Sequence, residues 1–241
     1  MTAEQLQIWG VLPDEDEQSD LASIARTWAG LVTPPADESV YPYRVSTADG
    51  RSESGTATDP DAIAGAFESA VAGRVRVVRD GRTVQFGSLP VTVSLYAPEQ
   101  FHLAPAWEVW IDAALLRDTD ESVVSKRHEE IVSLATEAHD TTGALFTFAH
   151  ATTGPYDPSI HPGRTALLQG DLSPLAWLSI LSPALVERVG RDQLLTVPVG
   201  DVEEQNDGTV ALRAFDDPLE RDVERLRAIE RHLEAGGSGG A

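Results

Sequence analysis

The chain contains no cysteine and almost no lysine. Lys126 is the one lysine among 241 residues, against seventeen arginines. Without cysteine the protein can form no disulfide, no thiolate metal site and no thiol nucleophile. No stretch approaches eighteen uninterrupted apolar residues, and residues 1–10 lack the basic and apolar parts of a secretory signal. We therefore expect neither a membrane span nor secretion by the general pathway.

Basic residues are scarce in general, and their scarcity predicts where the protein works. Eighteen lysines and arginines face 39 acidic residues, which gives a formal net charge of −21. Such a surface repels itself in dilute buffer, whereas at ~1 M salt the Debye length is about 3 Å and screens the repulsion. This composition, with many acidic residues and with arginine in place of lysine, resembles that of proteins from salt-in halophilic archaea. We expect a halophilic, cytoplasmic protein with an acidic surface.

The same charge distribution argues against two classes of partner. Nucleic acids are bound by a basic stripe that displaces counterions from the phosphates. The arginines are scattered among acids along the sequence and form no such stripe. Anionic membrane surfaces are disfavoured for the same reason, so we expect neither nucleic acid nor membrane as a partner.

The hydrophobic pattern predicts one α+β domain. With 41% hydrophobic residues the chain can bury a sizeable core, and nothing inside it reads as a long linker. We expect residues 1–235 to form this single domain and the Gly-rich residues 236–241 to form a flexible tail. Strands joined as hairpins favour a mostly antiparallel sheet, packed by about five helices, over a doubly wound sheet.

Apolar periodicity, caps and turn residues place the expected elements. Helices are predicted over residues 21–32, 60–71, 120–140, 174–181, 183–189 and 218–233. Strands are predicted over residues 4–12, 41–48, 75–79, 83–86, 90–96, 106–115, 144–149, 164–168, 195–202 and 209–215. Asp80-Gly81 and Asn206-Asp207-Gly208 are hairpin turns in this interpretation, and residues 49–59 form a loop.

No motif for catalysis or cofactor binding stands out. The six histidines show no HExxH, HxH or facial-triad spacing, and there is no GxSxG elbow or phosphate-binding loop. His150 and His161 flank a loop that contains Asp157, and they could converge on a metal. A hydrogen-bonded loop histidine is the simpler interpretation. We expect no catalytic residue, no metal and no cofactor.

Trp110 is the strongest candidate for a binding residue. In the strand over residues 106–115, apolar side chains occupy one face and Glu108, Trp110 and Asp112 the other. Charged neighbours predict a solvated face, where an exposed tryptophan suits a protein partner. The alternative is a tryptophan covered by a helix or loop. The predicted partner-binding residues are Glu108, Trp110 and Asp112, together with Tyr156 and Asp157 of the loop over residues 154–157.

Two stretches carry a resemblance to a known family. The first is Ile8-Trp9-Gly10, followed by a helix with Ala22, Ala25 and Arg26. The second comprises Trp177-Leu178-Ser179-Ile180-Leu181-Ser182, Leu185-Val186-Glu187-Arg188, a hairpin with Asp207-Gly208, and Phe215-Asp216-Asp217-Pro218 before the last helix. In these segments and in their order the chain resembles the immunity proteins of polymorphic and type VI toxin systems, especially the immunity protein 52 family.

The resemblance implies an α+β protein without catalytic activity that binds and blocks a cognate toxin. Ile180 stands where the family usually has an aromatic residue, and Ser182-Pro183 replaces a more common glycine. Residues 37–105 agree only in general pattern. Two alternatives remain open: a hydrolase or metal-dependent enzyme with a site near His150 and His161, and a regulatory or structural protein of halophiles.

Overall fold

The strands of the protein form one antiparallel sheet. The computed structural model describes residues 5–13, 21–35, 39–80, 88–96, 107–152, 164–172, 175–198, 200–219 and 222–237. Within them, ten strands pair in the order β3-β2-β4-β5-β6-β1-β7-β8-β10-β9, and every adjacent pair is antiparallel. The predicted α+β class with a mostly antiparallel sheet is confirmed.

The elements alternate irregularly along the chain. The strands are β1 (Gln5–Val11), β2 (Tyr41–Thr47), β3 (Ser52–Ala57), β4 (Ala70–Asp80), β5 (Ser88–Tyr96), β6 (Trp107–Asp112), β7 (Phe146–Thr152), β8 (Leu178–Leu181), β9 (Asp201–Glu204) and β10 (Val210–Arg213). The helices are α1 (Leu21–Leu31), α2 (Pro60–Phe67), the 3-10 turn η2 (Ala113–Leu116), α3 (Glu121–Thr142), α4 (Arg164–Leu168), α5 (Pro183–Val189), α6 (Arg191–Leu195) and α7 (Val223–Gly237).

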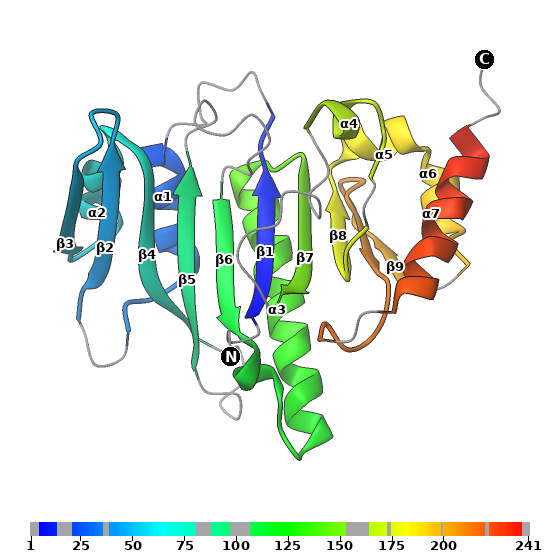
Figure 1. Cartoon of the computed structure of the whole chain (residues 1–241), viewed down its shortest axis with the longest axis horizontal. Coiled ribbons are helices and arrows are strands. Elements are labelled where there is room, and N and C mark those ends of the chain that lie inside the picture. Colours follow the sequence, from blue (N-terminus) through cyan, green and yellow to red (C-terminus); the bar gives the residue numbers. More distant parts are fainter. Residues whose placement is uncertain are drawn as a thin grey trace.

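The helices cover different parts of the sheet. Helices α1, α2 and α3 lie behind the strands β1 to β7 in the view of Figure 1, whereas α5, α6 and α7 gather at the end formed by β8, β9 and β10. Strand alternation fits this division, because the buried apolar residues Ile8, Val93 and Val109 share the face that carries α1 and α3. The opposite face of β2 and β4 keeps exposed side chains, among them Arg44 and Arg74.

Aromatic side chains pack α1 against the central strands in the hydrophobic core. The rings of Trp28 and Trp107 meet edge to face, with 5.1 Å between their centroids. Trp107 is fully buried, and its indole Nε1 donates a hydrogen bond to Thr142 Oγ1 at 3.0 Å. A Cβ atom at Gly10 would lie 1.9 Å from the Trp107 ring, so the indole can lie over β1 at this position only because the residue is glycine.

Helix boundaries follow the caps that the sequence contains. The Asp59 side chain accepts a hydrogen bond from the backbone N–H of Ala62, with Pro60 in the first turn of α2. Asp120 likewise accepts from the N–H of Ser122 at the start of α3. Gly143, at φ 64°, ends α3 in the left-handed conformation. These three signals confirm the predicted starts of α2 and α3 and place the end of α3 at Thr142.

Several predicted elements are wrong. Residues 178–181, predicted to lie in a helix, form strand β8; a short apolar run buried on both sides fits either element, and pairing with β7 and β10 decides for strand. Residues 164–168 form helix α4 rather than a strand. Residues 52–57, predicted as loop, form the edge strand β3, which is stabilised by pairing with β2 despite its Ser- and Gly-rich sequence.

Other boundaries shift by several residues. Helix α2 ends at Phe67, so Ala70 and Val71 open strand β4 instead of extending the helix. Strands β4 and β5 form an antiparallel pair with Asp80 opposite Ser88, so the predicted pairing of residues 75–79 with 83–86 across an Asp80-Gly81 turn is wrong; residues 81–87 lie outside the described residues. Helix α7 begins at Val223 and extends to Gly237, two residues into the predicted tail; residues 238–241 are outside the description.

Candidate functional site

The register of the strands places two rows of polar side chains on the face of the sheet opposite α1. Directly paired residues of neighbouring strands point to the same face. One row therefore contains Arg44, Arg74, Ser94 and Glu108, from β2, β4, β5 and β6. The adjacent row contains Arg76, Thr92, Trp110, Gln7 and His150. Gln7, Ser94 and Glu108 in these rows are buried, and we call the accessible part of this surface, with Arg44, Arg74 and Trp110, the open sheet face.

The open sheet face is hollowed. A depression of about 670 Å³ lies over it, lined by Gln5, Arg44, Ser46, Ser52, Ala72, Gly73, Arg74, Thr92, Ser94, Tyr96 and Trp110. The described lining contains two arginines and two aromatic side chains but no carboxylate. In a chain with 39 acidic residues this composition is unusual, and it gives the depression a positive local charge.

The predicted residues Glu108, Trp110 and Asp112 do share one strand face, but their surroundings differ. Trp110 is half-buried and lines the depression. Glu108 is 1% exposed, so the expectation of a fully solvated face is wrong at this position. Asp112 is exposed at the end of β6, where its carboxylate accepts a hydrogen bond from the N–H of Ala114 and caps η2. Tyr156 and Asp157 lie outside the described residues.

Burial changes the protonation of Glu108. The Tyr96 hydroxyl donates a hydrogen bond to Glu108 Oε2 at 2.9 Å. Loss of solvation raises the pKa of Glu108 to about 7, and hydrogen bonds from the Tyr96 and Trp110 side chains oppose this shift without cancelling it. The carboxyl therefore changes charge near neutral pH, directly beside the residues that line the depression.

Arg44 and Arg74 are the side chains that sequence reasoning missed. Arg44 Nε donates a hydrogen bond to Ser52 Oγ at 2.8 Å, and neither arginine forms an ion pair with any described residue. They are thirty positions apart in sequence and become neighbours only through the pairing of β2 with β4. One signal was available: alternating Arg and Val over residues 74–77 places Arg74 and Arg76 on the same strand face.

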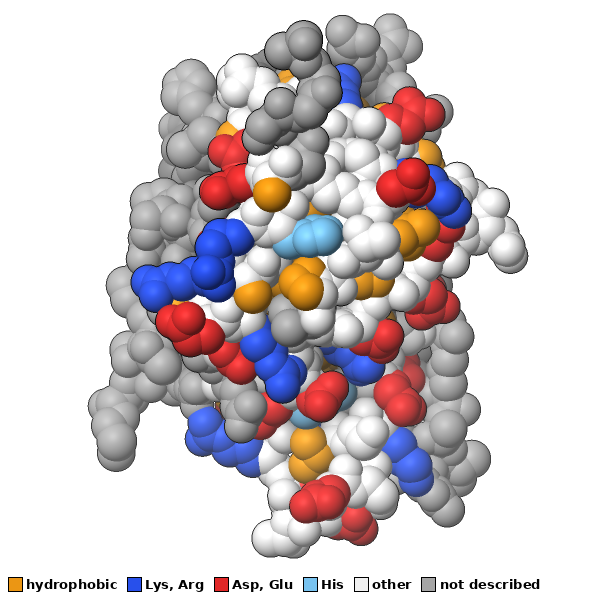
Figure 2. All heavy atoms as spheres, turned by 90° about the vertical axis from the view of Figure 1, so that its right-hand side faces the viewer, with side chains coloured by type: hydrophobic (Ala, Val, Ile, Leu, Met, Phe, Trp, Pro, Cys, Tyr) orange, Lys and Arg blue, Asp and Glu red, His pale blue; other side chains and the backbone are white. Residues whose placement is uncertain are grey.

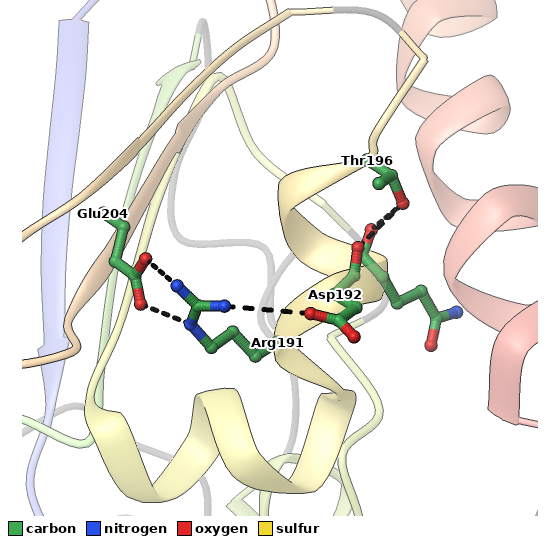
Figure 3. Close-up of polar contacts among 5 residues, drawn as sticks. Arg191, Asp192, Thr196 and Glu204 are labelled. Carbon is green, nitrogen blue, oxygen red and sulfur yellow. Dashed lines mark hydrogen bonds and ion pairs between the residues drawn. The ribbon is translucent and has the colours of Figure 1, made fainter.

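At the other end of the sheet Arg191 and Arg213 are paired with carboxylates, whereas Arg188 and Arg231 donate hydrogen bonds to backbone carbonyls. Figure 3 shows Arg191 bridging to both carboxylate oxygens of Glu204, with its Nε 2.6 Å from Glu204 Oε1, and reaching Asp192 at 3.7 Å. Arg213 pairs with Asp201 at 3.0 Å. Figure 2 shows the face at this end of the molecule with acidic and basic side chains interspersed. Arg44 and Arg74 have no carboxylate partner among the described residues, unlike Arg191 and Arg213.

The histidines occupy structural positions where they are described. His139 is buried, its Nδ1 lies 3.0 Å from Thr147 Oγ1, and burial lowers the pKa of His139 to about 4. The His150 ring stacks on Phe148 at 6.1 Å between centroids. His161 and Asp157 lie outside the described residues, so their convergence with His150 stays a prediction. Within the described ranges no three His, Asp or Glu side chains cluster as metal ligands.

Comparison with known proteins gives one finding about the fold. No family model matches the chain, and no curated protein sequence matches it. Among solved structures it is similar to the Pseudomonas aeruginosa T6SS protein PA0821, with 10% sequence identity and a TM-score of 0.50. The match covers 96% of this chain and 75% of that chain. At this identity the likeness shows a shared fold.

None of the helices in the described part of the chain is both long and apolar enough to span a bilayer.

Proposed function

We propose that this protein is a non-enzymatic binding protein that neutralises a cognate toxin by direct contact, in a cytoplasm of high salt content. The sequence segments shared with the immunity protein 52 family support this function. The fold supports it further, because a T6SS protein has a similar fold over 96% of the chain. The observation that carries the proposal is the open sheet face, where Trp110, Arg44 and Arg74 line the same depression.

The composition of the open sheet face suits a protein partner. Tryptophan, tyrosine and arginine are the residue types that most often dominate the binding energy of protein interfaces. Here Trp110 and Tyr96 line the depression beside Arg44 and Arg74. The depression is formed by side chains from several neighbouring strands, so it is broad and shallow in the way expected for a polypeptide surface.

High salt makes an aromatic anchor more important than long-range attraction. At ~1 M salt the Debye length of about 3 Å removes most electrostatic steering between proteins. Binding then depends on contacts made at short range, such as burial of the Trp110 indole and hydrogen bonds to arginine. In this proposal Glu108 and Asp112 flank the anchor along β6, and Tyr156 and Asp157 belong to the same binding surface.

Affinity capture in 2 M KCl tests the proposal. The protein is used as bait in lysate of its own host, and retained proteins are identified by mass spectrometry. We expect one protein retained in stoichiometric amount, toxic when expressed alone and harmless when co-expressed with this chain. Trp110→Ala should weaken its binding at least tenfold, because truncating a central aromatic anchor typically costs about 2 kcal/mol or more.

A matched control separates loss of the anchor from loss of any exposed apolar group. Leu168 on α4 is 39% exposed and does not line the depression, so Leu168→Ala should leave binding of the retained protein unchanged. A retained toxin that binds wild type and Trp110→Ala equally would remove the open sheet face from the interface. Absence of any retained toxic protein would contradict the proposed function itself.

A further inference from the structure

We propose that the open sheet face binds an acidic segment of the partner polypeptide, with Arg44 and Arg74 holding its carboxylates. The inference rests on the proposed function, because it specifies the chemistry of the partner at that same surface. It is derived from the placement of the two arginines, from the lining of the depression and from the distribution of charge over the rest of the chain.

The two arginines stand directly opposite each other on adjacent strands. Arg44 of β2 and Arg74 of β4 are register partners, which places their Cα atoms roughly 4.5–5.5 Å apart. Like charges in this position destabilise a sheet. Both side chains are exposed, and no described carboxylate neutralises them. An anion bound between them would remove the repulsion. Relief of this repulsion favours anion binding at the site.

The rest of the lining is matched to a hydrogen-bond acceptor. The hydroxyls of Ser46, Ser52, Thr92 and Ser94 surround the arginines, and each can donate one hydrogen bond. Guanidinium groups present planar, paired N–H donors that fit a carboxylate in a two-bond geometry. Trp110 and Tyr96 add apolar area at one side of the depression for the aliphatic stem of a glutamate or for a neighbouring side chain.

The overall charge makes such a site selective. A protein of net charge −21 repels polyanions, and this repulsion decays over about 8 Å at physiological ionic strength and over about 3 Å at ~1 M salt. Carboxylates that reach the depression contact two arginines. At this distance their attraction to the arginines is stronger than the screened repulsion from the acidic residues of the rest of the protein. A compact acidic segment fits this balance better than an extended polyanion such as single-stranded DNA, most of whose phosphates would lie over acidic surface.

A labelled hexaglutamate peptide provides the probe. Its binding to the full chain is followed by fluorescence anisotropy in 0.15 M KCl and in 2 M KCl. We expect saturable binding by wild type and at least a tenfold loss of affinity in Arg44→Gln and in Arg74→Gln. Arg191→Gln removes the same charge at the other end of the sheet, where Glu204 already pairs with the arginine, and should change affinity by less than twofold.

Three outcomes would overturn the inference. The first is absence of hexaglutamate binding. The second is a loss of affinity in Arg191→Gln as large as in Arg44→Gln and Arg74→Gln. The third is binding of a ten-nucleotide oligothymidylate that is tighter than that of hexaglutamate and depends on the same arginines. The last would assign the face to nucleic acid.

The toxin captured with the bait separates this inference from the proposed function. If toxin binding depends on Trp110 but is unchanged in Arg74→Gln, the acidic-segment inference fails and the proposed function stands. If hexaglutamate binding depends on both arginines while no toxic protein is retained by the bait, the carboxylate site stands and the proposed function fails.

Discussion

Glu108 shows how a single residue couples the open sheet face to protonation. Its side chain is 1% exposed, yet it belongs to the same row as the exposed Arg44 and Arg74. The pKa of Glu108 rises from 4.5 to about 7 because burial disfavours the charged form. Between these two pH values the folded protein keeps a proton that the unfolded chain has released. The free energy of unfolding therefore falls as the pH rises from about 4.5 to 7.

Replacing Glu108 with glutamine should remove this pH dependence. Glutamine keeps an oxygen that can accept the Tyr96 hydrogen bond, and it carries no charge at any pH. We expect Glu108→Gln to equal wild type in stability near pH 4 and to exceed it at pH 8 by up to about 3 kcal/mol, the equivalent of the pKa shift. Urea unfolding at pH 4, 6 and 8 in 2 M KCl measures the difference.

The control for this prediction is an exposed glutamate. Glu129 on α3 is exposed, so Glu129→Gln should leave the pH dependence of stability as in wild type. If Glu108→Gln loses stability from pH 4 to pH 8 as steeply as wild type does, Glu108 is ionised in the folded protein without penalty and its position near the depression has no influence on protonation.

At the scale of elements, the Trp107 indole of β6 lies very close to the backbone of Gly10 in β1. Gly10 pairs with Trp107, and a Cβ atom there would overlap the indole at 1.9 Å. We expect Gly10→Ala to destabilise the protein by about 1–3 kcal/mol, since Trp107 is fixed against Trp28 and cannot move away without disturbing the core. Thermal unfolding followed by circular dichroism measures the change.

A second glycine offers the matched comparison. Gly65 lies inside α2, and a Cβ atom there would meet nothing within 4 Å. Gly65→Ala should therefore stabilise the protein by roughly 0.5–1 kcal/mol through helix propensity. Equal changes in the free energy of unfolding for the two substitutions would show that the Trp107 ring does not restrict the side chain at position 10.

Local signals in the sequence were sufficient for elements with strong periodicity or caps. The stripe of α1, the Asp59 cap and the alternation in β6 all predicted what the structure shows. Strand β8 was misassigned because its four residues are all buried, three of them apolar, and such a run carries no periodicity. Strand β3 was missed because its sequence has no β preference of its own, and pairing with β2 is a tertiary effect that outweighs local propensity.

The candidate site shows the same division. Alternation along one strand predicted the shared face of Glu108 and Trp110, which the structure confirms. It could not predict that Glu108 is buried, because burial depends on Tyr96 and on neighbouring strands. The pairing of Arg44 with Arg74 could not be read from the sequence at all, since it requires the register between two strands thirty residues apart.

At the scale of the whole molecule, repulsion among acidic groups opposes folding in dilute buffer. The net charge of −21 is spread over a surface on which ion pairs such as Arg227 with Glu224 and Arg26 with Asp61 are exposed. Exposed pairs of this kind contribute little to stability individually. They therefore leave most of the repulsion among acidic groups uncompensated, and salt is the remaining means of reducing it.

The protein should become steeply more stable between 0.1 M and 2 M KCl. Screening acts on the compact state more than on the expanded unfolded chain, where like charges are farther apart. We expect a gain of at least about 2 kcal/mol, which corresponds to roughly 4–8 °C in Tm for a chain of this length. Sucrose at equal osmolality favours burial without screening charge, and it should give a smaller rise. A flat response to KCl would contradict adaptation to a high-salt cytoplasm, while the open sheet face and its proposed partner would be unaffected by that result.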